Sequence, residues 1–222
     1  MGHIVTRTVV SHQAWDDLLQ KHVSEKGKVD YRGWQKDMNQ LNAYLEMLAQ
    51  HTPNKSWGRN EKVAYWINAY NAFTVKLILD NYPLRSIRDL DNGAVWDREW
   101  IKLGGQTYSL NQIEHEILRK RYPDPRIHFA VNCAATSCPP LLSRAYTAEK
   151  LEMQLEQQTK AFITNETYNK LGRKEVIVSK IFDWYREDFG SLISFLNQYT
   201  DVPINANASV QYREYDWALN KQ

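Results

Sequence analysis

Residues 60–80 read NEKVAYWINAYNAFTVKLILD, which is the most apolar helical pattern in the 222-residue chain. Apolar side chains fall nearly all round the predicted helix, and such a helix belongs at the centre of a fold. Asn68 and Asn71 lie three positions apart and therefore share one face of it. A buried amide needs hydrogen-bond partners. We expect these two asparagines either to tie down neighbouring loops or to face a ligand pocket.

Weaker patterns on both sides of this helix predict the rest of the fold. Helical spacing follows Ser11, recurs over 41–48, and returns after Ser109, after Thr147 and over 189–199. Extended segments are predicted over 96–103, 106–108, 127–132, 176–182 and 210–212, with Gly104-Gly105 as a hairpin turn. The sequence therefore predicts an α+β fold. Residues 11–222 would form a single, mainly helical domain around a small, mostly antiparallel sheet, after an N-terminal extension over 1–10.

Composition excludes several classes of partner. The net charge is +2 and the basic residues are scattered, so we expect no nucleic-acid partner. No apolar run approaches the roughly 18 residues that a membrane span needs. The start, Met1-Gly2-His3, leaves two locations open: periplasmic or secreted if a leader has been removed, and otherwise cytoplasmic.

Cysteine chemistry is the most specific signal in the chain. Residues 132–140 read NCAATSCPP and contain both cysteines, Cys133 and Cys138. Small residues let a ligand approach the backbone, and a thiolate nucleophile needs a nearby base, usually histidine. We expect Cys133 to be the nucleophile and Cys138 the second choice, with Ser137 able to donate a hydrogen bond to Cys138. The Cys-x4-Cys spacing is a weak zinc signal, so no metal and no cofactor is predicted.

Chain order constrains the histidine that could serve these thiols. All six histidines precede both cysteines, so a simple papain order, with Cys before His, is excluded. On a strand over 127–132, His128 would lie about 16 Å from Cys133 and point to the other face. His115 is then the easier partner, with Asn68, Asn71 or Asn132 as the orienting group. Each histidine and each thiol is also compatible with a purely structural role, or the thiols with a disulfide.

Four segments together resemble a known family. They are residues 61–72 (EKVAYWINAYNA), 109–115 (SLNQIEH), 126–140 (RIHFAVNCAATSCPP) and 215–220 (YDWALN). They resemble the family catalogued as domain of unknown function 547, from about Ser11 to Asn220. The resemblance implies an exported bacterial protein. By analogy with papain-like folds, it also implies a rearranged papain-like core and a Cys-His hydrolase or transferase acting on peptide-like amides.

Three functions follow from these residues. In the first, Cys133 attacks a carbonyl, His115 or His128 is the base, and amides from Ala134 to Ser137 hold the oxyanion. In the second, the same loop binds a small thiol or peptide (glutathione-like) without turnover, and Arg126 pairs with a carboxylate. Asn68, Asn71, Asn132 and Ser137 are the other candidate ligand-binding residues. In the third, the domain is structural and both cysteines are buried or bridged.

Overall fold

The computed structural model describes residues 10–222, so the predicted extension lies outside the described residues except for Val10. The helices are α1 (Gln13–His22), α2 (Tyr31–Trp34), η1 (Gln35–Asp37), α3 (Met38–Gln50), α4 (Arg59–Asp80), η2 (Ile87–Gly93), η3 (Val95–Asp97), the π-helix η4 (Gln112–Arg119), the 3-10 helix η5 (Pro125–Phe129), α5 (Leu151–Ile163), α6 (Ile181–Trp184), α7 (Arg186–Phe189) and α8 (Leu192–Leu196). The strands are β1 (Ile101–Leu103), β2 (Gln106–Tyr108), β3 (Lys170–Leu171), β4 (Glu175–Val178) and β5 (Ser209–Tyr212). Within residues 10–222, every helix is too short or too polar to cross a lipid bilayer.

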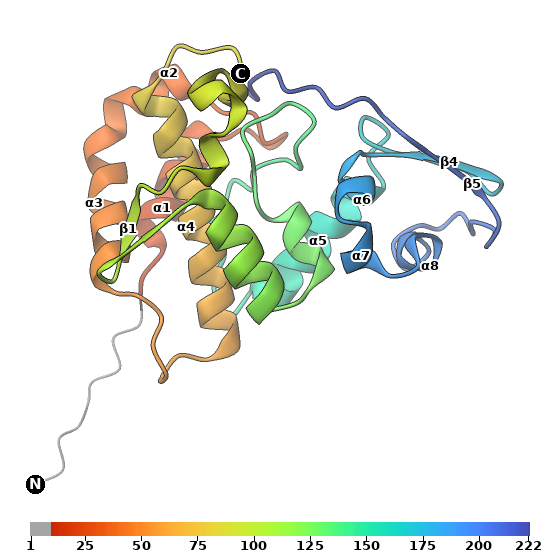
Figure 1. Cartoon of the computed structure of the whole chain (residues 1–222), viewed down its shortest axis with the longest axis horizontal. Coiled ribbons are helices and arrows are strands. Elements are labelled where there is room, and N and C mark those ends of the chain that lie inside the picture. Colours follow the sequence, from red (N-terminus) through yellow and green to blue (C-terminus); the bar gives the residue numbers. More distant parts are fainter. Residues whose placement is uncertain (1–9) are drawn as a thin grey trace, which may run out of the picture.

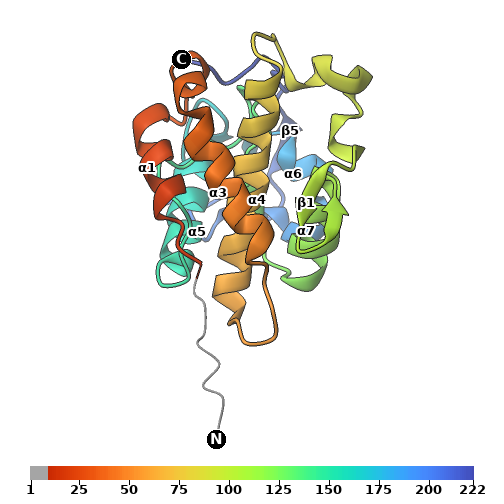
Figure 2. The ribbon, with the colours of Figure 1, turned by 90° about the vertical axis from the view of Figure 1, so that its left-hand side faces the viewer.

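Helix α4 is the central helix that its sequence predicts. At its start the Gly58 amide donates to Glu61 Oε2 at 2.6 Å, which satisfies one of the N–H groups left open at a helix end. Its length of 22 residues corresponds to about 33 Å. Figure 1 shows α4 between α3 and the green η4, and both elements contact it. Figure 2 shows α3 lying across the face of α4.

The strands form two small sheets. β1 and β2 make an antiparallel hairpin, and its turn residues Gly104 and Gly105 both have positive φ, at 57° and 80°. Glycine suits such a turn because it has no Cβ to clash. The other sheet has the order β3-β4-β5, antiparallel for the first pair and parallel for the second. The α+β fold class and the hairpin turn are confirmed.

Two hydrophobic cores meet near the predicted site. The larger is built around α1, α3 and α4, and the smaller lies under β4, α6, α7 and α8. Helix α5 serves both, because Leu151 and Leu155 enter the first core while Phe162 enters the second. Helix η5 does the same with Ile127 and Phe129. The cysteine loop follows η5 and therefore begins at the junction of the two cores.

The predicted helix over 189–199 is wrong in its extent. Gly190 has a φ of 59°, which breaks the helical path between α7 and α8. The Ser191 side chain then accepts from the Ser194 amide and caps the short α8. The predicted capping box at Ser109 and Gln112 is confirmed, with hydrogen bonds of 2.8 and 3.1 Å in the two directions.

Candidate functional site

The segment before the two cysteines folds as a short helix, so the predicted strand over 127–132 is wrong. Asp124 caps this helix by accepting a hydrogen bond from the Arg126 amide at 2.9 Å. Pro125 occupies the first turn, where its fixed φ is already helical and no N–H partner is needed. These local signals outweigh the apolar, strand-like composition, and η5 forms over Pro125–Phe129.

The expected separation of His128 from Cys133 assumed an extended strand, so it does not apply to this helix. Both residues line one cavity. The Nε2 atom of His128 lies 2.6 Å from Asp188 Oδ2, and the ring stacks on Tyr185 with centroids 4.0 Å apart. The carboxylate therefore fixes the ring orientation and leaves Nδ1 as the second nitrogen. Nδ1 is buried and has no hydrogen-bond partner among residues 10–222.

The Asp188 carboxylate is held by Arg119 and His128. Arg119 donates to both of its oxygens, at 2.6 and 2.9 Å, and His128 contacts the same carboxylate. The hydrogen bond with His128, together with those from Arg119, keeps the pKa of Asp188 far below its usual range. Asp188 therefore stays ionised and can stabilise a positive charge on the imidazole.

His115 belongs to the surroundings of this site and does not line the cavity with the thiols. Its Nδ1 lies 3.2 Å from Arg119 Nη1, and its ring lies 6.2 Å from that of Tyr185. The guanidinium of Arg119 stacks over the Tyr185 ring at 5.0 Å. His115 thus contacts the group that holds Asp188. Its predicted role as base stays a prediction, and the geometry now favours His128 for that role.

The two thiols are unbridged and have different environments. Cys133 is half-buried and Cys138 is buried. Hydrogen bonding from the Cys138 thiol lowers the pKa of Cys133, and the Tyr215 hydroxyl, whose oxygen is 3.3 Å from Sγ, adds to the effect. The Ala135 amide acts in the same direction. Burial and the neighbouring Cys133 raise the pKa of Cys138. Cys133 is therefore the more readily ionised thiol of the pair.

The backbone amides expected to form an oxyanion hole already have partners inside the protein. The amides of Ala134, Thr136 and Ser137 donate to Asn132 Oδ1 at 2.9 Å, Ala218 O at 2.7 Å and Asp216 O at 3.1 Å. The Ala135 amide points to the Cys133 sulfur. The oxyanion hole predicted at these amides is wrong. The C-terminal segment occupies two of them, and the sequence alone did not predict that pairing.

Two asparagines shape the cysteine loop from beneath. Asn71 donates to Ala130 O at 2.9 Å and accepts from the Asn132 amide at 2.8 Å. Asn132 in turn donates to Pro139 O at 2.8 Å and accepts from Asn220 Nδ2 at 3.2 Å. These bonds fix both ends of the loop to α4 and to the C-terminal segment.

The other predicted ligand-binding residues also have protein partners. Asn68 bonds the backbone of Tyr146 in both directions, Arg126 pairs with Asp124, Glu152 and Glu156, and Ser137 Oγ accepts from the Asp216 amide. None of these three residues lines the cavity that contains the thiols. Their contact with a ligand stays a prediction.

The cavity that holds Cys133, which we name the thiol cavity, has a volume of about 230 Å³. Its other lining residues are Tyr70, Trp96, Asn111, Glu114, His128, Val131, Cys138, Pro139, Ile181, Trp184, Tyr185, Tyr215 and Trp217. Glu114 is 5% exposed and accepts a hydrogen bond from the Tyr185 hydroxyl at 2.9 Å. The Tyr70 hydroxyl has no hydrogen-bond partner within the described part of the chain.

Sequence reasoning missed Asp188, Tyr185 and Glu114. Asp188 and Tyr185 lie in a helical region with no motif of their own, and only the fold brings them to His128. Glu114 is the immediate neighbour of His115, and its place in the cavity was not predicted. On the π-helix η4 the two side chains diverge, and only Glu114 enters the cavity. The motif that begins at Tyr215 does not by itself predict a contact with Cys133.

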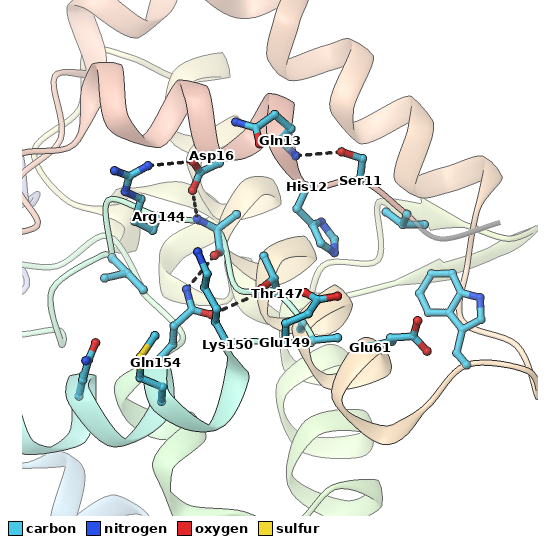
Figure 3. Close-up of a pocket in the computed structure, with 18 residues that line it drawn as sticks. Ser11, His12, Gln13, Asp16, Glu61, Arg144, Thr147, Glu149, Lys150 and Gln154 are labelled. Atoms are coloured by element: carbon cyan, nitrogen blue, oxygen red, sulfur yellow. Dashed lines mark hydrogen bonds and ion pairs between the residues drawn. The ribbon is translucent and has the colours of Figure 1, made fainter. Parts of the chain in front are cut away.

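A second cavity, which we name the α1–α5 cavity, has the larger volume of about 570 Å³. It is lined by the start of α1, the start of α4 and the segment that leads into α5, as Figure 3 shows. Asp16 accepts from the Ala145 amide at 2.8 Å, and Gln154 donates to Ala145 O at 2.8 Å. His12 Nδ1 lies 2.8 Å from the Tyr44 hydroxyl, and burial lowers the pKa of His12 to about 4.

A family model described as a protein of unknown function, DUF547, matches residues 54–163, about half of the chain. The chain belongs to this family. The match is shorter than the resemblance from Ser11 to Asn220 indicated. In this DUF547 protein it includes α4, both cysteines, His115 and His128, whereas Asp188 and Tyr215 lie beyond it. No curated protein and no solved structure matches the chain.

Within residues 10–222, His, Cys, Asp and Glu side chains do not gather in groups of three or more that could hold a metal ion. The polar groups of the residues that line the thiol cavity include the two thiols, the His128 imidazole, the Glu114 carboxylate and three tyrosine hydroxyls.

Proposed function

We propose that this protein is a thiol-dependent hydrolase or transferase that acts on peptide-like amides, with Cys133 as nucleophile and His128 as base. One observation carries the proposal: a thiol with a lowered pKa lines the same cavity as a buried histidine that is held by a carboxylate on one nitrogen and unpaired on the other. This is the general arrangement of nucleophile, base and orienting acid, although the orienting contact is to Nε2.

The reaction would proceed in two steps. His128 takes the proton of the Cys133 thiol, and the resulting thiolate attacks the amide carbon, so that the C–S bond forms and the carbonyl electrons move to oxygen. Collapse of this intermediate breaks the C–N bond, and the imidazolium of His128 gives its proton to the leaving amine. His128 then takes a proton from water or from an acceptor nucleophile, which attacks the thioester and releases the thiolate.

Tyr70 is our candidate for stabilising the oxyanion. The usual amide donors are occupied, whereas its hydroxyl faces the cavity without a protein partner. A preorganised donor of this kind is typically the largest single contribution to such catalysis.

Alkylation of the thiols with iodoacetamide, measured across pH with mass mapping of the modified residue, tests the proposal. We expect Cys133 to react first, with a rate that stays high at pH values well below ~8.5, where an ordinary thiol loses its thiolate. The Cys138→Ser variant should keep a reactive Cys133, and Cys133→Ser should abolish rapid labelling. A normal pH dependence at Cys133 would contradict an enzymatic role.

A second candidate function is non-catalytic binding of a small thiol or peptide ligand. The aromatic walls and unpaired polar atoms of the thiol cavity favour it as well, since they suit recognition without turnover. In that case Cys133 would label with an ordinary pH profile. Labelling only after denaturation would instead indicate a structural domain.

A further inference from the structure

The thiol cavity has one wall made of contacting aromatic rings. Trp184 lies 4.8 Å from Tyr215 and 5.9 Å from Trp217 between ring centroids, and Trp96 lies 5.6 Å from Trp217. Such rings offer a large apolar surface for methylene groups. The wall therefore suits a ligand that is apolar along its length.

A buried carboxylate lies in the same cavity. Glu114 is 5% exposed, and only its Oε1 is engaged, by the Tyr185 hydroxyl. Its Oε2 has no hydrogen-bond partner within residues 10–222. This oxygen is not fully buried, so a donor on a ligand can reach it and form a charge-assisted hydrogen bond. The nearby cation Arg119 is already committed to Asp188.

Among the described residues that line the cavity, Glu114 is the one carboxylate, and His128 is the one base that can carry a positive charge. Its lining contains Glu114 and the Cys133 thiol, and no lysine or arginine among the described residues. The negative charge of Glu114 acts against ionisation of Cys133. A cation bound at Glu114 would compensate for that effect, so the site favours a positively charged ligand near a working thiolate.

Cavity size limits the bound part of such a ligand. A volume of about 230 Å³ is below the roughly 300–1,000 Å³ of sites that enclose a whole drug-sized ligand. It suits one side chain of a larger molecule. We propose that the cavity recognises a primary ammonium on a short aliphatic chain, with the ammonium at Glu114 and the methylene groups against the tryptophans. This subsite rests on the proposed function and names its substrate class: peptide-like amides with a lysine-like cationic group.

Intrinsic tryptophan fluorescence of the full chain, titrated with n-butylammonium chloride at constant ionic strength, tests the subsite. We expect saturable binding that is at least about tenfold tighter than that of n-butanol or butyrate, because the charge-assisted hydrogen bond to Glu114 is available only to the ammonium. Equal affinity for the three probes would overturn the proposal, and this comparison needs no variant.

Two variants assign the binding to Glu114. Glu114→Gln keeps an acceptor for Tyr185 but loses the charge, so the affinity for butylammonium should fall at least about tenfold, to the level of butanol. The matched control Glu149→Gln changes an exposed glutamate in the α1–α5 cavity and should leave the affinity unchanged. Unchanged affinity in Glu114→Gln would contradict the subsite. If Cys133 is alkylated rapidly but the protein does not prefer butylammonium, the subsite is rejected and the proposed enzyme stands. If the protein prefers butylammonium but Cys133 has the pH dependence of an ordinary thiol, the proposed enzyme is rejected.

Discussion

The two cavities differ in size and in the state of their polar groups, and the smaller one is the better functional candidate. In the α1–α5 cavity, Asp16 and Gln154 each bond another part of the protein (Figure 3), and His12 bonds the Tyr44 hydroxyl. In the thiol cavity, His128 Nδ1 is buried and has no partner within the described chain. Buried polar groups are normally satisfied, so exceptions indicate where a ligand or a reacting group belongs. Volume alone would have selected the other cavity.

The largest effect expected from a single change is at Asn132, beneath the thiol cavity. Asn132→Ala leaves the Pro139 carbonyl, the Ala134 amide and Asn220 without their partner. We expect a loss of about 3–5 kcal/mol in the free energy of unfolding, measured by urea denaturation, because each unsatisfied buried group costs roughly 1–3 kcal/mol. The rate at which iodoacetamide alkylates Cys133 should also change.

The matched variant for this comparison is Asn68→Ala. It removes the two bonds to the Tyr146 backbone, on the side of the α1–α5 cavity. We expect its free energy of unfolding to fall by somewhat less than that of Asn132→Ala, and the alkylation rate of Cys133 to stay unaltered. If both variants changed that rate equally, the two regions would not be independent.

An intermediate effect is expected from pH at the α1–α5 cavity. The pKa of His12 is lowered to about 4 by burial, while that of an unfolded histidine is about 6.5. Between these values the unfolded chain binds the proton and the folded chain does not, so stability falls as the pH decreases through this window. His12→Gln should remove about 1–3 kcal/mol of this pH dependence in urea denaturation. Parallel stability curves for the two proteins would contradict the prediction.

The smallest effect concerns Tyr215. Tyr215→Phe removes the hydroxyl that contacts the Cys133 sulfur and should raise the pKa of that thiol. A hydrogen bond to a charged group contributes about 1.5–3 kcal/mol. We therefore expect iodoacetamide labelling near pH 7 to slow about tenfold, with little change in melting temperature. Tyr199→Phe, which removes a hydroxyl bonded to Glu156 outside both cavities, should label at the wild-type rate.

Sequence reasoning succeeded where the pattern was local. The all-round apolar spacing of 60–80 predicted α4, paired glycines predicted the hairpin, and the Ser109 motif predicted its capping box. The two cysteines were singled out by a motif. In each case the residues that decide the structure lie within a few positions of one another.

Sequence reasoning failed at one local signal and, more often, where distant segments decide the outcome. Residues 127–132 have strand-like composition, yet Asp124 and Pro125 begin a helix there. The amides after Cys133 looked available, and only the C-terminal segment, which bonds two of them, shows that they are not. The contact of Asp188 with His128 joins residues 60 positions apart in separate helices. A local sequence pattern cannot predict such a contact.

The contact between Cys133 and Tyr215 joins residues 82 positions apart in the chain. At a translation rate of roughly 5–20 residues per second, Tyr215 is added about 4–16 s after Cys133. During that interval the nascent thiol lacks the hydroxyl that favours its ionised form. The order of synthesis therefore leaves Cys133 without this contact until the segment that carries Tyr215 has left the ribosome.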